Sequence, residues 1–151
     1  MGPRLLLLVS ALLLYTPFCA QGASRLGDPS TSHPVSCQDG ERRADLILNV
    51  TSPSAAVPLR VRIEHYRLDR ASQAQTRPVL LLSTRPVTPF GLWNSRLSDP
   101  LHQDGQWHTL GLALDEERQS SHYDIEVDVD FGVNASGHAA GCTITLTDIQ
   151  P

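Results

Sequence analysis

The 151-residue sequence predicts an all-β protein, a single antiparallel β-sandwich of about six to eight strands that is closed by one disulfide bond. Three observations lead to this prediction. In several segments apolar residues alternate with polar residues with a period of two, which is typical of strands that place one face in a core. Proline and glycine separate these segments. Two cysteines, Cys37 and Cys142, lie near opposite ends of the region that carries the pattern.

The expected strands follow one another along the chain at 44–50, 59–64, 79–82, 107–115, 123–131 and 142–147. The clearest is 123–131, where five apolar residues from Tyr123 to Phe131 alternate without error with acidic residues. The turns between strands are marked by Pro53, Pro58, Pro78, Pro86, Pro89 and Pro100. No window shows an amphipathic helical stripe with capping residues, so a sandwich of antiparallel strands is the expected architecture.

The N-terminus decides the expected compartment. Arg4 precedes an apolar run that is too short to span ~30 Å of hydrocarbon, and Ala20 and Gly22 supply the small residues that signal peptidase requires. We therefore expect a secreted, extracellular protein without membrane insertion. The expected divisions are a signal peptide over 1–22, a flexible leader over 23–36 because apolar residues are scarce there, and a β-sandwich domain over 37–151.

Cysteines and sequons agree with secretion. Cys19 falls within the expected signal peptide, which leaves Cys37 and Cys142 to pair in an oxidising compartment. This pairing predicts a monomer, and the alternative is an intermolecular bridge that makes a disulfide-linked dimer. Asn49 and Asn134 each begin an N-x-S/T sequon, so both are predicted glycosylation sites.

One expected strand carries a row of carboxylates at roughly 6.5–7 Å intervals. The row consists of Asp124, Glu126, Asp128 and Asp130. It has three interpretations: a solvated face paired across strands with arginines such as Arg60 and Arg62, an edge strand whose charge prevents unwanted pairing, or an acidic strip that contacts a basic partner. A straight strand spreads its carboxylates instead of converging them on one ion, so we expect no metal site.

Aromatic residues mark a second candidate surface. The proline-rich segment 84–106 contains Phe90 and Trp93, which are suited either to anchor a protein partner or to cap the core. Phe90, Trp93 and the four carboxylates of the acidic row are the predicted partner-binding residues.

No motif in the sequence specifies a reaction. There is no Gly-x-Ser-x-Gly elbow, no His-Glu-x-x-His and no glycine-rich phosphate loop, so we expect no catalytic residues and no cofactor. The chain has no lysine and a formal net charge of −4, which makes nucleic acid an unfavourable partner.

The function predicted from these features is that of a secreted, non-enzymatic binding module. It would serve as a soluble ligand for a cell-surface receptor or as an extracellular adaptor, so its expected partner is a cell-surface or extracellular protein. Two alternatives stay open. One is a small secreted hydrolase or glycan-active enzyme whose site assembles only in three dimensions, and the other is a carrier of an apolar ligand.

Overall fold

The computed structural model describes residues 30–51, 58–69, 77–117, 119–133 and 137–150. The described residues form eight strands and no helix, so none of them belongs to a helix that could cross a membrane. The strands are β1 (Ser30–Asp39), β2 (Arg42–Thr51), β3 (Leu59–Leu68), β4 (Val79–Pro86), β5 (Asn94–Leu97), β6 (His108–Glu116), β7 (Tyr123–Val133) and β8 (Ala139–Ile149). The expected signal peptide, residues 23–29 of the expected leader and Asn134 lie outside the described residues.

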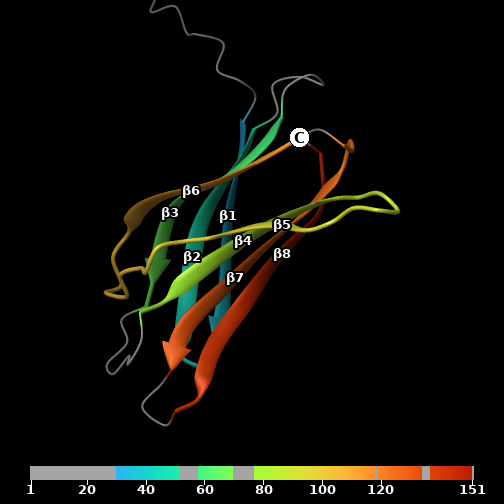
Figure 1. Cartoon of the computed structure of the whole chain (residues 1–151). Coiled ribbons are helices and arrows are strands. Elements are labelled where there is room, and N and C mark those ends of the chain that lie inside the picture. Colours follow the sequence, from blue (N-terminus) through green and yellow to red (C-terminus); the bar gives the residue numbers. More distant parts are fainter. Residues whose placement is uncertain (1–29, 52–57, 70–76, 118, 134–136, 151) are drawn as a thin grey trace, which may run out of the picture.

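The strands form two antiparallel sheets of four strands each, packed face to face (Figure 1). One sheet has the strand order β1-β2-β3-β6 and the other has the order β5-β4-β7-β8. The predicted all-β sandwich is therefore confirmed, with the strand number at the upper end of the expected range.

The core lies between the sheets, and the alternation in the sequence decides which side chains enter it. In β7 every second residue from Tyr123 to Phe131 is almost fully buried, and the acidic residues between them lie on the outer face. The inner faces of the other strands contribute Ala44, Leu46, Leu48, Val50, Leu59, Val61, Ile63, Tyr66, Leu68, Leu80, Leu82, Leu112, Leu114 and Ile144.

β1 corrects one expectation, because residues 30–36 lie in this strand and not in a flexible leader. β1 pairs with β2 over ten residues, from Ser30 opposite Thr51 to Asp39 opposite Arg42. Its side chains are exposed or half-buried, so backbone hydrogen bonds to β2 hold the strand more than an apolar face does. Residues 30–36 contain few apolar residues, and for this reason their composition resembles that of a disordered segment.

The two open sides of the sandwich are each linked across the sheets. On one side the predicted disulfide is confirmed, since Cys37 of β1 and Cys142 of β8 are bonded with their Cα atoms 5.8 Å apart. Both strands are at sheet edges, so the bond joins one sheet to the other. On the other side Arg96 of β5 donates a hydrogen bond through Nη1 to the carbonyl oxygen of Ala113 in β6, at 3.1 Å.

Candidate binding surface

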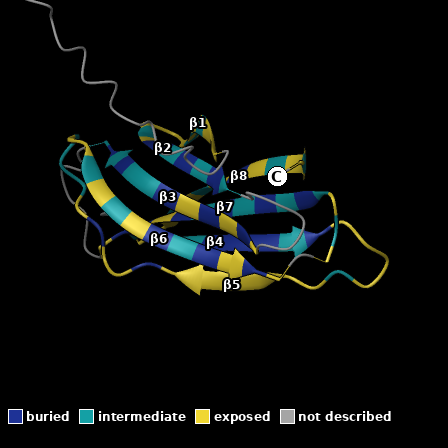
Figure 2. Ribbon diagram, turned by 90° about the horizontal axis from the view of Figure 1, so that it is seen from above, coloured by how far each residue is buried: buried dark blue, intermediate teal, exposed yellow. Residues whose placement is uncertain are grey.

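Exposed apolar side chains gather in the loop that joins β4 to β5, residues 87–93, which we call the β4–β5 loop. Of the large apolar residues that are exposed in the described part of the chain, four belong to this loop: Val87, Phe90, Leu92 and Trp93. Phe90 is 91% exposed and Leu92 is 81% exposed. The loop projects beyond the ends of the sheets, as the yellow-green segment of Figure 1 and the exposed segment of Figure 2 show.

The tip of the loop is a tight turn that contains the exposed residue Phe90. The amide of Gly91 donates to the carbonyl oxygen of Thr88 at 3.1 Å, which closes a β-turn with Pro89 and Phe90 at its centre. Proline at the second position and glycine at the fourth suit a type I turn. A Cβ atom added to Gly91 would lie 2.0 Å from the carbonyl oxygen of Pro86, so only glycine fits this fold of the loop.

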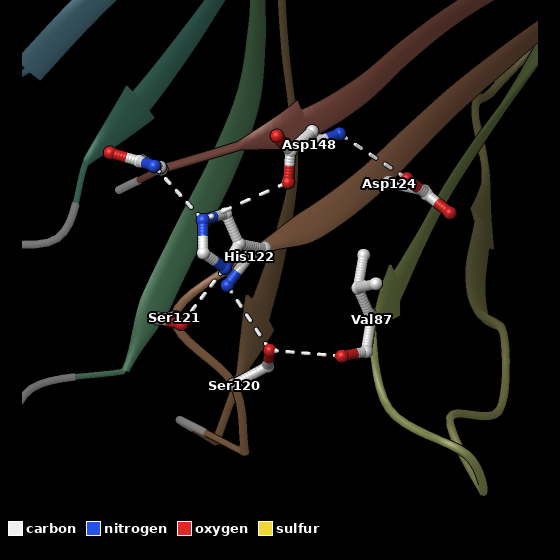
Figure 3. A network of polar contacts seen from close by, with 7 residues as sticks. Val87, Ser120, Ser121, His122, Asp124 and Asp148 are labelled. Carbon is white, nitrogen blue, oxygen red and sulfur yellow. Dashed lines mark hydrogen bonds and ion pairs between the residues drawn. The ribbon is translucent and has the colours of Figure 1, made fainter.

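The base of the loop is held on both sides. On the β4 side, the amide of Val87 donates to the carbonyl oxygen of His122 at 2.9 Å, and the Ser120 hydroxyl donates to the Val87 carbonyl oxygen at 3.3 Å (Figure 3). On the β5 side, the buried carboxylate of Glu116 accepts hydrogen bonds from Asn94 at 2.8 Å and from Thr84 at 3.3 Å. The sheet therefore fixes the direction in which the loop projects.

Arg85 connects the loop to the acidic row. Its guanidinium carbon lies 4.8 Å from the centroid of the Trp93 ring, and the same group forms an ion pair with Asp124. The pairing follows from the register of β4 and β7, which sets Arg85 directly opposite Asp124. Trp93 and Asp124, both predicted as partner-binding residues, thus belong to one contiguous surface. Arg85 and Leu92 are part of it and were not among the predicted residues.

The rest of the acidic row has no arginine beside it in the sheet. Glu126 lies between Ser83 and Thr145, and Asp128 lies between Leu81 and Thr143. The Thr143 hydroxyl donates to Asp128 at 2.6 Å, and the backbone amide of Gly132 donates to Asp130 at 2.7 Å. Three carboxylates on the outer face of the β5-β4-β7-β8 sheet therefore have no arginine opposite them on the neighbouring strands.

Two interpretations of the row are wrong in detail. Arg60 and Arg62 lie on β3 in the other sheet, where Arg60 pairs with Asp115 at 2.5 Å. β7 is also an interior strand between β4 and β8, so its charges do not protect an edge. Strand membership in a sheet depends on long-range pairing, which local alternation does not report.

The predicted glycosylation site Asn49 lies near the end of β2, as a half-buried residue on the outer face of the β1-β2-β3-β6 sheet. Its side-chain oxygen is buried and has no hydrogen-bond partner among the described residues. Within the same residues, no group of three or more His, Cys, Asp or Glu side chains is placed to hold a metal ion.

A serine, a histidine and an aspartate, namely Ser121, His122 and Asp148, lie near one another at the end of β8 (Figure 3). The Ser121 hydroxyl is 2.9 Å from Nδ1 of His122, and Asp148 is 3.7 Å from Nε2 of His122, which is too long for a hydrogen bond. The Gln150 amide nitrogen contacts the same Nε2 at 2.9 Å. The ring of His122 thus lies between the Ser121 hydroxyl and the Gln150 amide, and Asp148 makes no hydrogen bond that would orient it as the aspartate of a Ser-His-Asp triad does.

A second histidine cluster has no serine or cysteine among its contacts in the described part of the chain. His108 stacks on His102 and on Tyr66, with ring centroids 5.0 and 5.3 Å away, and its Nε2 contacts Asp104 at 2.9 Å. The hydrogen bond from His108 lowers the pKa of Asp104 below its ordinary value. These contacts order the turn that leads into β6.

Comparisons with protein families, curated proteins and solved structures find no match for this chain.

Proposed function

We propose that this chain is a secreted glycoprotein that acts as a non-enzymatic binding module for a cell-surface or extracellular protein. The observation that carries the proposal is the pair Phe90 and Leu92, exposed at the tip of a loop whose two ends are fixed to the sandwich. Burying a large apolar side chain stabilises a complex by about 1.5–3 kcal/mol. A held loop loses little conformational entropy on binding, so more of this stabilisation remains as affinity.

The surface around the loop indicates the chemistry of the partner. Phe90 and Leu92 require an apolar pocket, and the acidic row beside Trp93 favours a basic rim around that pocket. Charge complementarity of this kind raises the association rate and selects the orientation of the complex. The expected contribution of the acidic row is therefore to rate and specificity, whereas the loop supplies most of the affinity.

Three features support secretion and glycosylation. The apolar run behind Arg4 has the length of a signal peptide, and two sequons follow it. The Cys37–Cys142 bond favours an oxidising compartment. We therefore expect the protein in the medium of expressing cells, without residues 1–22 and with glycan at Asn49 or Asn134.

The proposal is tested by cross-linking the glycosylated protein, purified from the medium, to a panel of cell types in the presence of unlabelled competitor. Saturable capture of one surface protein is expected. The double variant Phe90→Ala/Leu92→Ala should compete at least ten-fold less well than the unaltered protein, which corresponds to about 1.4 kcal/mol. Leu97→Ala is the matched control, because Leu97 is 59% exposed on the same sheet but lies outside the loop.

Equal competition by the double variant and the unaltered protein would show that the loop is not the docking element. Retention of the protein inside the cells, with residues 1–22 still attached, would contradict the secretory part of the proposal independently.

A further inference from the structure

The outer face of the β1-β2-β3-β6 sheet contains a groove of about 310 Å³. Its principal lining residues are Pro34, Ser36, Arg43, Asp45, Arg67 and Trp107. It belongs to the other sheet from the acidic row and the β4–β5 loop, so it is separate from the surface assigned above.

One carboxylate holds two arginines in this groove. Arg43 donates through Nε to Oδ1 of Asp45 at 2.8 Å, and Arg67 donates through Nη2 to Oδ2 at 2.7 Å. The Asp45 side chain is 12% exposed, whereas those of Arg43 and Arg67 are 50% and 40% exposed. The arginines are thus fixed from below by a buried acid and open to solvent above.

The two guanidinium groups keep unused hydrogen-bonding capacity. Their contacts with Asp45 use Nε and Nη2, and the Nη1 group of neither arginine has a hydrogen-bond partner among the described residues. Two positive charges against one negative charge leave the groove with a net charge of about +1. Guanidinium donors fixed in this way suit a planar or tetrahedral oxyanion.

Trp107 adds a flat apolar wall beside these donors. The guanidinium carbon of Arg67 lies 5.2 Å from the Trp107 ring centroid, and Trp107 is 48% exposed. The electron-rich face of an indole attracts the polarised C–H groups of a sugar ring, whereas an acidic peptide offers mainly carboxylates. The pairing of an oxyanion site with an aromatic wall therefore favours a sugar that carries a sulfate or carboxylate group.

We propose that the groove formed by Arg43, Asp45, Arg67 and Trp107 binds a negatively charged sugar residue of an extracellular carbohydrate chain. The sulfate or carboxylate oxygens accept hydrogen bonds from the Nη1 groups, which have no partner within the described residues, and the sugar ring lies against Trp107. The site gives the protein a second attachment on the sheet opposite its protein-binding loop, and it does not rest on the function proposed for that loop.

Titration calorimetry with the purified, secreted protein tests this inference. Three probes are compared: a sulfated uronic-acid hexasaccharide, the same hexasaccharide after desulfation, and a hexaglutamate peptide. We expect the sulfated hexasaccharide to bind, and we expect Arg67→Gln and Arg43→Gln each to weaken its binding about ten-fold. Trp107→Leu should weaken binding similarly. It leaves the ion pairs of Asp45 with Arg43 and Arg67 in place, so a loss of binding in this variant reports on the site and not on the stability of the fold.

Arg60→Gln is the matched control, because it removes the same charge from the outer face of β3 at a position outside the groove. It should change affinity less than two-fold. Equal binding of the desulfated probe would support the inference with carboxylate as the recognised group. The inference is overturned if no hexasaccharide binds, if hexaglutamate binds as tightly as the sulfated sugar, or if Arg60→Gln weakens binding as much as Arg67→Gln.

Discussion

The guanidinium carbon of Arg85 lies 4.8 Å from the Trp93 ring centroid, and the same guanidinium pairs with Asp124. One side chain of β4 therefore supports the aromatic residue at the end of the β4–β5 loop and neutralises the first carboxylate of the acidic row. A cation–π contact at an exposed site contributes about 0.5–1 kcal/mol, which is enough to bias the orientation of a half-exposed indole. The surface proposed to bind a partner is ordered by this contact before any partner arrives.

Replacement of Arg85 tests this ordering. Arg85→Ala should lower the free energy of unfolding by only about 1 kcal/mol, because the ion pair is partly exposed. It should weaken partner capture several-fold, because Trp93 loses the guanidinium that supports its ring and Asp124 loses its ion-pair partner. The fluorescence of Trp93, read in a Trp107→Phe background, should shift to the red as the ring becomes more exposed to water. An unchanged emission spectrum would contradict the proposed support.

Gly91 should tolerate no side chain. Gly91→Ala places a methyl group against the Pro86 carbonyl oxygen, and relieving such overpacking costs about 1–3 kcal/mol or a rearrangement of the loop. We expect capture of the partner to be lost while the strands keep their circular dichroism signal. Gly40→Ala is the control: at φ 60° it strains the β1–β2 hairpin by about 1–2 kcal/mol but should leave capture intact.

The disulfide should contribute a large part of the stability. Cys37 and Cys142 are 105 residues apart, and closing a loop of about this length stabilises the folded state by up to ~4.7 kcal/mol in the chain-entropy model. The double variant Cys37→Ser/Cys142→Ser should therefore unfold at a much lower urea concentration than the oxidised protein. A loss below about 1 kcal/mol would show that the packing of the two sheets holds the edges together without the bond.

Asp45 should make stability depend on pH in the acid range. Burial raises the pKa of Asp45, but hydrogen bonds and charge interactions with Arg67 and Arg43 outweigh it, so the pKa in the folded state lies below the ordinary value. A lowered pKa contributes stability that is present above the unfolded value of about 3.9 and is lost as the pH falls through the folded value. Asp45→Asn should cost about 1.5–3 kcal/mol at pH 7.

The same variant provides the check by urea unfolding at two pH values. The difference between Asp45→Asn and the unaltered protein should shrink markedly between pH 7 and pH 2.5. A difference that stays constant over this range would show that the carboxylate contributes through packing and not through its charge.

The interior strands were predictable and two edge strands were not. Alternation identified β7 because Ile125, Val127 and Val129 each enter the core while their neighbours face water. All four residues of β5 are exposed, and β1 is held mainly by its pairing with β2, so neither strand leaves an apolar pattern in the sequence. Backbone pairing alone does not require a particular composition, which is why β1 resembled a flexible leader.

The candidate surface was predictable only in part. Phe90 and Trp93 were expected either to anchor a partner or to cap the core, and Pro89 and Gly91 around Phe90 carried the turn signal that places it outside. The role of Arg85 depends on the register between β4 and β7, and the partner of Arg60 depends on which strands share a sheet. Register and sheet membership arise from pairing between distant segments, so single-sequence patterns do not contain them.

The most direct test of the central claim places a photoreactive benzoylphenylalanine at position 90 of the secreted protein and irradiates it on cells that capture the unaltered protein. We expect a light-dependent adduct with one surface protein, which excess unaltered protein suppresses and excess Phe90→Ala/Leu92→Ala does not. The same group at position 97 should give no such adduct. An absent adduct at position 90, or an equal one from position 97, would contradict docking through the β4–β5 loop.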